Sequence, residues 1–248
     1  MPQTRTCRPL FSRAFLFHRD NCSSAEGDPL AAGETDLTAY DHVMVGANLA
    51  LLAAQQRRYG WSIVTMSAVA AALPDWDGLT ILSGGELYAR VHRVWGHNIT
   101  VASALGAAAG AIGYLVYLRG WWGKIGRLLP SSTTVKSALA SSPVFRLSQL
   151  ATWWVFGTIA CLSHLAFDLV YSRHAALTPW PLALLWPFSA RTWVYPVVPY
   201  GDLGATAIFI VEMFVLCHRP SRATPIAWIT MGLVLAYIGL RWQIGAVN

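Results

Sequence analysis

Residues 98–118 read NITVASALGAAAGAIGYLVYL, and this stretch decides the fold class. It contains no charged residue, and its length matches the ~20 residues that an α-helix needs to cross a bilayer. Gly106, Gly110 and Gly113 recur at helical spacing, which allows a second helix to approach closely. The stretch therefore predicts a transmembrane helix packed against a neighbour.

The composition of the whole chain agrees with a membrane protein. Of its 248 residues, 55% are hydrophobic and only 12% are charged, whereas a soluble domain carries about a quarter charged residues. Charged residues this scarce are too few to cover the surface of a soluble globular protein. The high content of apolar residues excludes disorder for most of the chain. The 12 tryptophans, several near the ends of apolar runs, suit the membrane interface.

Five further apolar runs flank the first one. They are about Leu37–Gln56, Trp61–Leu73, Leu147–Tyr171, Leu203–His218 and Thr224–Arg241. The run Trp61–Leu73 is short for a span, so we expect it to be tilted, buried among other helices or re-entrant. Because no series of alternating strands is present, a β-barrel is not expected. We predict an all-α, polytopic transmembrane bundle of about five to six apolar helices.

Two segments differ from these runs. Residues 1–36 hold four arginines and then a Ser/Gly/acidic stretch, with no convincing signal-peptide core, so they are predicted to be a flexible N-terminal tail. Residues 37–248 are predicted to form a single integral membrane domain. The loop Ser172–Asp202 is rich in Pro and Trp, which favours a packed loop over a tether.

The charge and the cysteines exclude two classes of function. The net charge of +6 comes without a Lys/Arg run interleaved with aromatic residues, so it indicates membrane orientation and lipid attraction, and no nucleic-acid partner is expected. The cysteines form no CxxC pair, so neither a disulfide framework nor a cysteine–zinc site is expected.

Basic residues suggest an orientation in the inner (plasma) membrane. The links at 57–60, 119–146 and 218–224 carry nine basic and no acidic residues, and they share one side if all six runs cross. The positive-inside rule places that side in the cytoplasm. The opposite side carries five arginines, and the tail lies on that side with four more. Each side therefore has nine basic residues, which weakens the assignment.

Polar residues that are costly in a membrane gather at the opposite end of the predicted bundle. They come from the start of the run Leu37–Gln56, the end of the run Trp61–Leu73, the link before residue 98 and the end of the run Leu147–Tyr171. These residues are Asp41, His42, Asp75, Asp77, His92, Arg93, His97, His164 and Asp168. Because independent placement would not select one end, the pattern predicts a His/Asp functional cluster at one membrane face, on the non-cytoplasmic side.

Histidine and carboxylate side chains are ligands that suit Zn, Mn or Fe. His164 and Asp168 are four residues apart, so on a helix they share a face. In an extended turn, Asp75 and Asp77 would point apart, toward two metals or toward a metal and an arginine. His92 and His97 would converge only in a loop or at a helix start.

Ordinary structural roles remain open for several of these residues. A single histidine near a helix end commonly makes an interfacial hydrogen bond, and Asp41 is favoured as a charge at a helix N-terminus. Arg93 would either clamp a phosphate or brace an aspartate. Glu212, in the middle of an apolar run, would pair inside the bundle.

The order of these motifs resembles the YdjM-type inner-membrane proteins, which are also described as membrane-bound metal-dependent hydrolases. The resemblance covers about residues 40–190 and rests on His42…Gly46, Pro74-Asp75-Trp76-Asp77, His92-Arg93…His97, His164…Asp168 and Trp186-Pro187-Phe188-Ser189. The family usually has Thr-His-Ser where this chain has Gly96-His97-Asn98. Its pattern is similar to zinc-dependent phospholipase C and nuclease enzymes.

The resemblance and the cluster together predict a membrane-bound metal-dependent hydrolase that acts on a phosphoester or lipid-linked substrate. One or two divalent ions, Zn foremost, would be held by His42, Asp75, Asp77, His92, His97, His164 and Asp168. Asp75 or Asp77 would be the general base, with Arg93 beside them.

The alternative is a non-catalytic metal-binding membrane protein, a transporter or a scaffold. A transporter should show polar groups through the depth of the membrane, and here Asn48 and Glu212 are the exceptions in mostly apolar runs.

Overall fold

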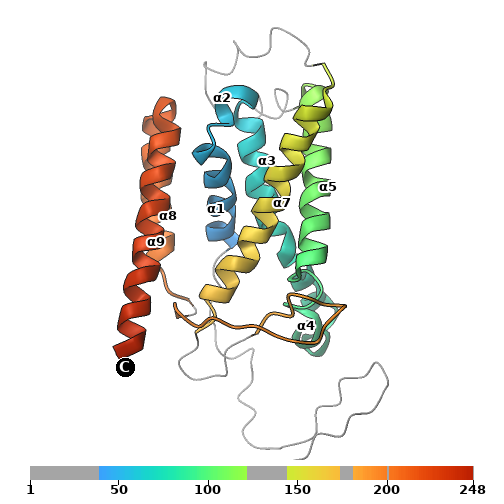
Figure 1. Cartoon of the computed structure of the whole chain (residues 1–248), viewed down its shortest axis with the longest axis vertical. Helices are drawn as coiled ribbons and strands as arrows, with labels where there is room; N and C mark the ends of the chain where they lie inside the picture. Colours follow the sequence, from blue (N-terminus) through green and yellow to red (C-terminus); the bar gives the residue numbers. More distant parts are fainter. Residues whose placement is uncertain (1–38, 122–143, 174–180, 200, 248) are drawn as a thin grey trace, which may run out of the picture. The chain divides into compact units, whose positions relative to one another are not determined.

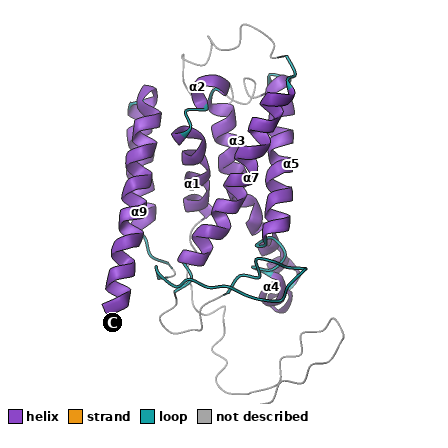
Figure 2. Ribbon diagram, in the orientation of Figure 1, coloured by secondary structure: helices purple, strands orange, loops and turns teal. Residues whose placement is uncertain are grey.

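The computed structural model describes residues 39–121, 144–173, 181–199 and 201–247. Within these ranges the chain forms helices and loops, with isolated β-bridges but no β-strand (Figure 2). The predicted all-α fold class is confirmed. The predicted tail at 1–36 and most of the basic link at 119–146 lie outside the described residues.

The six apolar runs correspond to six helices, joined by shorter helical pieces (Figure 1). The apolar helices are α1 (Ala39–Leu52), α3 (Trp61–Ala72), α5 (Ile99–Leu118), α7 (Leu147–Val170), α8 (Gly204–His218) and α9 (Ala223–Val247). The short pieces are α2 (Gln56–Tyr59), the 3₁₀-helix η1 (Leu73–Ser83), α4 (Gly85–Val91) and the 3₁₀-helix η3 (Pro220–Arg222).

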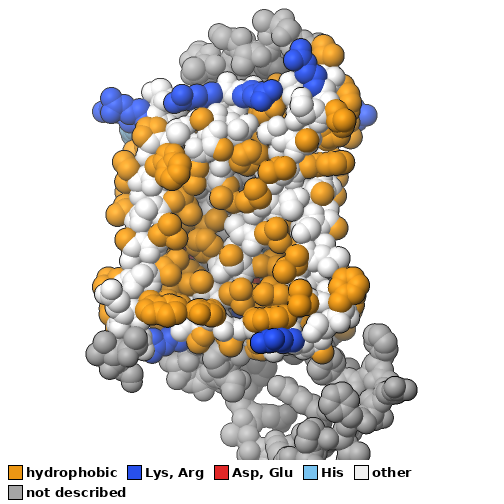
Figure 3. Space-filling model, viewed as in Figure 1, with side chains coloured by type: hydrophobic (Ala, Val, Ile, Leu, Met, Phe, Trp, Pro, Cys, Tyr) orange, Lys and Arg blue, Asp and Glu red, His pale blue; other side chains and the backbone are white. Residues whose placement is uncertain are grey.

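Three segments are long and apolar enough to cross a membrane: α5, α7, and Pro220–Gly245, which includes most of α9. Apolar side chains cover the face shown in Figure 3, with Lys and Arg along its upper and lower edges. The other apolar helices are shorter, with 14 residues in α1, 12 in α3 and 15 in α8. Three spans are therefore supported, and crossing by α1, α3 and α8 stays a prediction.

Helices α5 and α7 cross with their backbones in contact. A Cβ added to Gly106 would lie 2.4 Å from the Gly157 carbonyl oxygen, and one added to Gly110 would lie 2.3 Å from that of Trp153. Only glycine leaves room for so close an approach. The helix contact predicted from the glycine spacing is confirmed, and it fixes the C-terminal half of α7 beside the start of α5.

The short helix α3 lies among α1, α5 and α7. Ile63, Met66 and Ala70 are buried within the main apolar core. Of the three expectations for this run, burial among other helices is the one that the structure shows. A second apolar core around Phe209 and Val234 joins α8 and α9 to α1.

Two further expectations hold. Glu212 is buried and accepts a hydrogen bond from Asn48 Nδ2 at 2.8 Å, so it does pair inside the bundle. The described part of the loop after α7 is packed, because Leu182 and Val198 are fully buried. Its Leu184 carbonyl also accepts a hydrogen bond from the Ile99 amide at 2.9 Å, at the start of α5.

Candidate metal centre

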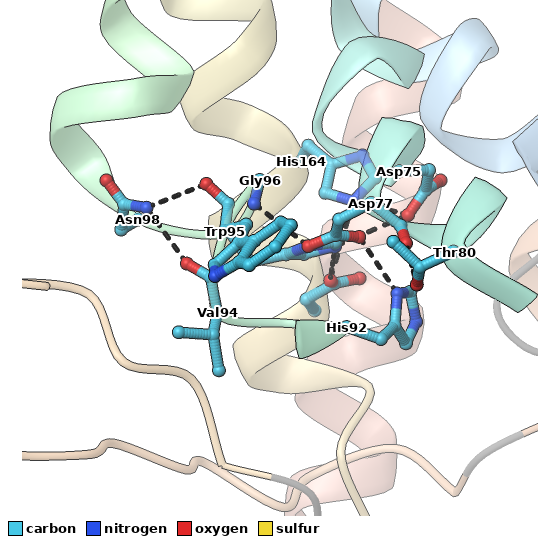
Figure 4. A network of polar contacts seen from close by, with 11 residues as sticks. Asp75, Asp77, Thr80, His92, Val94, Trp95, Gly96, Asn98 and His164 are labelled. Carbon is cyan, nitrogen blue, oxygen red and sulfur yellow. Dashed lines mark hydrogen bonds and ion pairs between the residues drawn. The ribbon is translucent and has the colours of Figure 1, made fainter. Parts of the chain in front are cut away.

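The two aspartates after α3 lie on the 3₁₀-helix η1, not in an extended turn as expected. Pro74 occupies the beginning of η1, where its fixed φ suits a tight helical turn and its missing N–H has no cost. With three residues per turn, Asp75 and Asp77 point in different directions. Asp75 faces His97 and His164, whereas Asp77 faces His92 and His97 (Figure 4).

The loop between α4 and α5 approaches η1 closely enough to require a glycine. A Cβ on Gly96 would lie 1.9 Å from the Pro74 carbonyl oxygen. The Gly96 amide donates a hydrogen bond to Asp77 Oδ2 at 2.9 Å (Figure 4). This contact brings His97 to Asp77, and it gives a physical reason for glycine at position 96.

Asn98 fixes the same loop from its other side. Its Oδ1 accepts a hydrogen bond from the Val101 amide at 2.9 Å, which caps the N-terminus of α5. Its Nδ2 donates to the carbonyls of Val94 and Trp95, both at 2.9 Å (Figure 4). The asparagine thus caps α5 and holds the loop that carries His97 at the start of this helix.

Four ligand atoms converge at the end of the bundle; we call Asp75, His97, His164 and Asp168 the central quartet. His97 Nε2 lies 3.1 Å from His164 Nε2, 3.3 Å from Asp75 Oδ1 and 3.2 Å from Asp168 Oδ2. His164 Nε2 lies 3.3 Å and 3.5 Å from the same two carboxylate oxygens. Ligands at about 2.0–2.1 Å from a tetrahedral ion are roughly 3.3 Å apart. The two histidine nitrogens therefore form one face of such a tetrahedron with the Asp75 oxygen, and another face with the Asp168 oxygen.

The outer nitrogens of the two histidines set their protonation. His164 Nδ1 lies 2.7 Å from the Ala71 carbonyl oxygen, which can only accept, so Nδ1 carries the proton. His97 Nδ1 lies 3.2 Å from Asp77 Oδ2, which likewise accepts. In their neutral forms both histidines direct an Nε2 lone pair into the quartet, as metal-ligating histidines do.

Asp77 is fully buried and holds two histidines. It contacts His92 Nδ1 at 2.9 Å and His97 Nδ1 at 3.2 Å. Burial raises the pKa of this carboxyl, but the hydrogen bonds from His92, His97 and the Gly96 amide outweigh burial and lower its pKa to about 2. Asp77 is therefore a carboxylate at neutral pH, and its contacts suit the orientation of His97.

Asp75 is the accessible carboxylate, with 37% of its side chain exposed. Burial raises its pKa, but the hydrogen bonds with His164 and His97 outweigh burial and hold the pKa below its usual range. Burial lowers the pKa of His97, whereas its carboxylate neighbours raise it well above its ordinary value. The anions around this imidazole thus attract a cation, either a proton or a metal ion.

His42 contacts Asp168 of the quartet, and the charge of Arg93 acts on the same carboxylate. His42 Nε2 lies 3.3 Å from Asp168 Oδ1, and its ring stacks on that of His164 with centroids 3.6 Å apart. Arg93 is buried, its charge acts on Asp168, and its φ of 63° is rare for a residue other than glycine. Burial favours Arg93 as a brace for the aspartate over a clamp for an exposed phosphate.

Comparison with known proteins comes from a family model. A model described as YdjM inner membrane protein matches residues 37–245. The chain belongs to the YdjM inner membrane protein family. No curated protein and no solved structure matches it. The predicted family is confirmed, and the inner-membrane location in its description agrees with three candidate spans.

In this YdjM family member, all seven predicted metal ligands belong to contiguous groups that could hold an ion. The groups are His42/His164/Asp168, Asp75/His97/His164 and Asp77/His92/His97. The second and third groups share His97 through opposite nitrogens, so a neutral imidazole can serve only one of them as a ligand. Asp41 stays apart: its Oδ2 accepts a hydrogen bond from Thr206 at 2.9 Å, in keeping with a helix-start role.

Sequence reasoning missed the backbone groups of the centre. The Ala71 carbonyl and the Gly96 amide orient His164 and Asp77, yet neither belongs to a polar side chain. It also missed Trp76 and Trp95 as neighbours. Both are partly exposed, with ring centroids 6.3 Å apart, and their positions beside Asp75 and His97 were the available signal.

Proposed function

We propose that this protein is a membrane-bound metal-dependent hydrolase that acts on a phosphoester, most specifically a lipid-linked one. The observation that carries the proposal is the central quartet, in which the two histidine Nε2 atoms lie 3.1–3.5 Å from each other and from both carboxylate oxygens, the spacing of neighbouring ligands on a tetrahedral zinc ion. Two neutral imidazoles and two carboxylates are a donor set that zinc accepts. The match to the YdjM family supports a site in the inner membrane.

The quartet would hold the first ion through His97 Nε2, His164 Nε2, Asp75 and Asp168. Asp168 Oδ1 faces His42, so these two residues could hold a second ion beside the first. Bound divalent zinc lowers the pKa of a water molecule toward neutrality and polarises a substrate oxygen. It would also offset the cost of several carboxylates in a nearly buried site.

The protein's own residues have separable roles in this proposal. Asp75 faces the accessible side, so it is the candidate to orient the attacking water and accept its proton. Asp77, which also bonds to His92, holds His97 in the tautomer that presents Nε2. Arg93 offsets the charge of Asp168. Asp77 and Arg93, which the sequence suggested as catalytic, act in this scheme as positioning residues.

The surface beside Asp75 supports a lipid-linked substrate. Trp76 and Trp95 are partly exposed there, and η1 continues with Leu79 and Leu82, of which 67% and 84% are exposed. Exposed apolar residues next to a polar site suit a substrate whose head group enters water while its chain stays in lipid. We place this side of the protein on the non-cytoplasmic face, as the basic links suggest.

The test uses detergent-purified full-length protein. We expect roughly one or two equivalents of zinc per chain by elemental analysis, and hydrolysis of a phospholipid or lipid-linked phosphoester from a panel. Asp75→Asn and His164→Ala should abolish hydrolysis, while Glu212→Gln, a carboxylate outside the centre, should retain it. Absence of any bound metal would refute the site. Bound metal without hydrolysis of any panel member would favour the non-catalytic alternative.

A further inference from the structure

A groove runs along the outside of the α8–α9 hairpin, away from the metal centre. Its upper part, with a volume of about 800 Å³, is lined by residues that include Phe214, Val215 and Ile229. A lower part, of about 390 Å³, shares Val215 and Ile229 and continues down to Ile208 and Leu233. The two parts share these residues and so lie next to each other along the hairpin, and we call them together the hairpin groove.

The upper end of the hairpin groove is basic. Its lining includes His218, Arg219 and Arg222, all exposed, and within the described ranges no carboxylate pairs with the two arginines. His218 Nδ1 donates to the Phe214 carbonyl at 2.8 Å, which leaves its other nitrogen for an outside partner. Two guanidinium groups that can donate to an anion therefore lie at one opening.

The start of α9 adds to this positive potential. Arg222 immediately precedes Ala223, the first residue of α9, and no acidic residue lies in the first turn. A helix N-terminus is the positive end of its dipole, where a basic side chain is unfavourable unless an anion is bound nearby. The two arginines and the helix dipole therefore favour the same kind of ligand, a negatively charged group such as a phosphate.

Below this basic opening the groove is apolar over the depth of one leaflet. From His218 to Ile208 the helix rises by about 15 Å, half of the ~30 Å hydrocarbon core. The walls are mainly Val, Ile and Leu, with Glu212 and Thr230 buried at the floor against α1 and α8. A free phosphate would use only the opening, whereas an acyl chain would also fill the walls.

We propose that the hairpin groove binds a phospholipid with an anionic head group, taken from the leaflet at the basic end of the bundle. Its phosphate lies between Arg219 and Arg222, and one acyl chain lies between α8 and α9. The site is at the opposite end of the hairpin from η1 and α4, next to which the metal centre lies (Figure 1). It is therefore a lipid site separate from the proposed substrate.

The experiment counts the lipids that stay bound to the purified protein. Full-length protein is reconstituted in vesicles of phosphatidylcholine with added phosphatidylglycerol, extracted, and examined by native mass spectrometry. We expect wild type to retain phosphatidylglycerol selectively. The double variant Arg219→Gln/Arg222→Gln should retain roughly 30-fold less phosphatidylglycerol, because it lacks two surface charges that each attract the lipid with ordinary strength. The matched control Arg57→Gln/Arg58→Gln removes the same charge from α2 at the same end and should retain the lipid.

Two further arms separate a lipid site from simpler explanations. Ile229→Trp fills the groove but keeps both arginines, so it should also reduce retention. Glycerol phosphate, which has the head group without chains, should not compete with the lipid at comparable concentration. Equal loss in both arginine double variants, or equal retention of phosphatidylcholine by wild type, would overturn the proposal. Circular dichroism and gel filtration verify that each variant is folded.

Discussion

Single hydrogen bonds decide the chemistry of the two central histidines. His164 receives its orientation from the Ala71 carbonyl, and His97 receives it from Asp77. Both partners bind the nitrogen that points away from the quartet, which leaves Nε2 as the ligand atom. In the proposed metal centre, Asp77 therefore acts by orienting His97.

The change Asp77→Asn tests this role. The amide can still accept a hydrogen bond from Gly96, but it is neutral and holds the His97 tautomer less firmly. We expect metal affinity to fall by about 10–100-fold, measured by competition with a chelator of known affinity. Asp75→Asn, which removes a charged ligand, should lower affinity further. Unchanged affinity in Asp77→Asn would contradict the positioning role.

Asp202 gives a prediction for pH that is independent of the metal centre. It accepts hydrogen bonds from Tyr237, Arg241 and the Gly204 amide, the last at 2.8 Å. Burial raises its pKa, but these bonds outweigh burial and lower it. A carboxylate with a lowered pKa stabilises the fold above its unfolded pKa of about 3.9, and this contribution is lost as the pH falls below that value.

We therefore expect Asp202→Asn to destabilise the protein by about 1–2 kcal/mol at neutral pH. The difference from wild type should shrink as the pH is lowered below about 4. Thermal unfolding in detergent across this range measures the difference between the two proteins. A gap that stays constant down to pH 3, or widens, would be incompatible with the ion pair as its source.

At the scale of elements, the α5–α7 crossing determines whether the centre can form. Residues 96–98 directly precede α5, while His164 and Asp168 lie in the last turns of α7. The contact of Gly106 and Gly110 with the backbone of α7 sets how far apart these groups are. A wider crossing would separate His97 from His164.

The variant Gly106→Ala examines this contact. Its Cβ would lie 2.4 Å from the Gly157 carbonyl oxygen, so the helices must separate. We expect the free energy of unfolding to fall by roughly 1–3 kcal/mol, as is typical of overpacking, and metal binding to weaken. Unfolding in mixed micelles measures the change in stability. Gly239→Ala in α9 is the control, because no atom lies within 4 Å of its added Cβ. Equal effects of the two changes would show that helix propensity, not the crossing, matters.

At the scale of the whole described domain, arginines lie at both ends, but the carboxylates of the central quartet gather at one. The α8–α9 turn and α2 lie at one end of the helices and α4 at the other (Figure 1). The first two segments carry Arg219, Arg222, Arg57 and Arg58, and the central quartet lies beside η1 and the start of α5. If the bundle crosses the membrane as the basic links suggest, the arginines face the cytoplasm and the metal centre faces outward.

Single-cysteine labelling checks this orientation. In a background without other cysteines, native Cys217, exposed at the end of α8, is compared with Ala190→Cys in the exposed loop near the centre. A membrane-impermeant maleimide should label Ala190→Cys in intact spheroplasts, and Cys217 only after permeabilisation. The opposite pattern would place the centre in the cytoplasm.

The sequence by itself determined the helices and the residue types of the site. The six apolar runs agree with the observed helices within a few residues, except that α9 extends to Val247, although only three of these helices are long enough to cross a bilayer. It did not reveal η1 or α4, because the short segment that contains them has neither the length nor the periodicity of a helix signal. Scarce charge made Asp and His informative wherever they occurred.

Only the tertiary structure decided how those residues meet. Which nitrogen of His97 faces Asp75 and which faces Asp77 depends on the path of the 92–98 loop over Pro74. That path depends on a glycine amide, a carbonyl and a helix crossing, which are backbone features without a pattern of charge or hydrophobicity. Each residue's identity fixes the chemistry of its side chain. The distances of about 3 Å that give a metal centre its geometry come from segments that pack together across the fold.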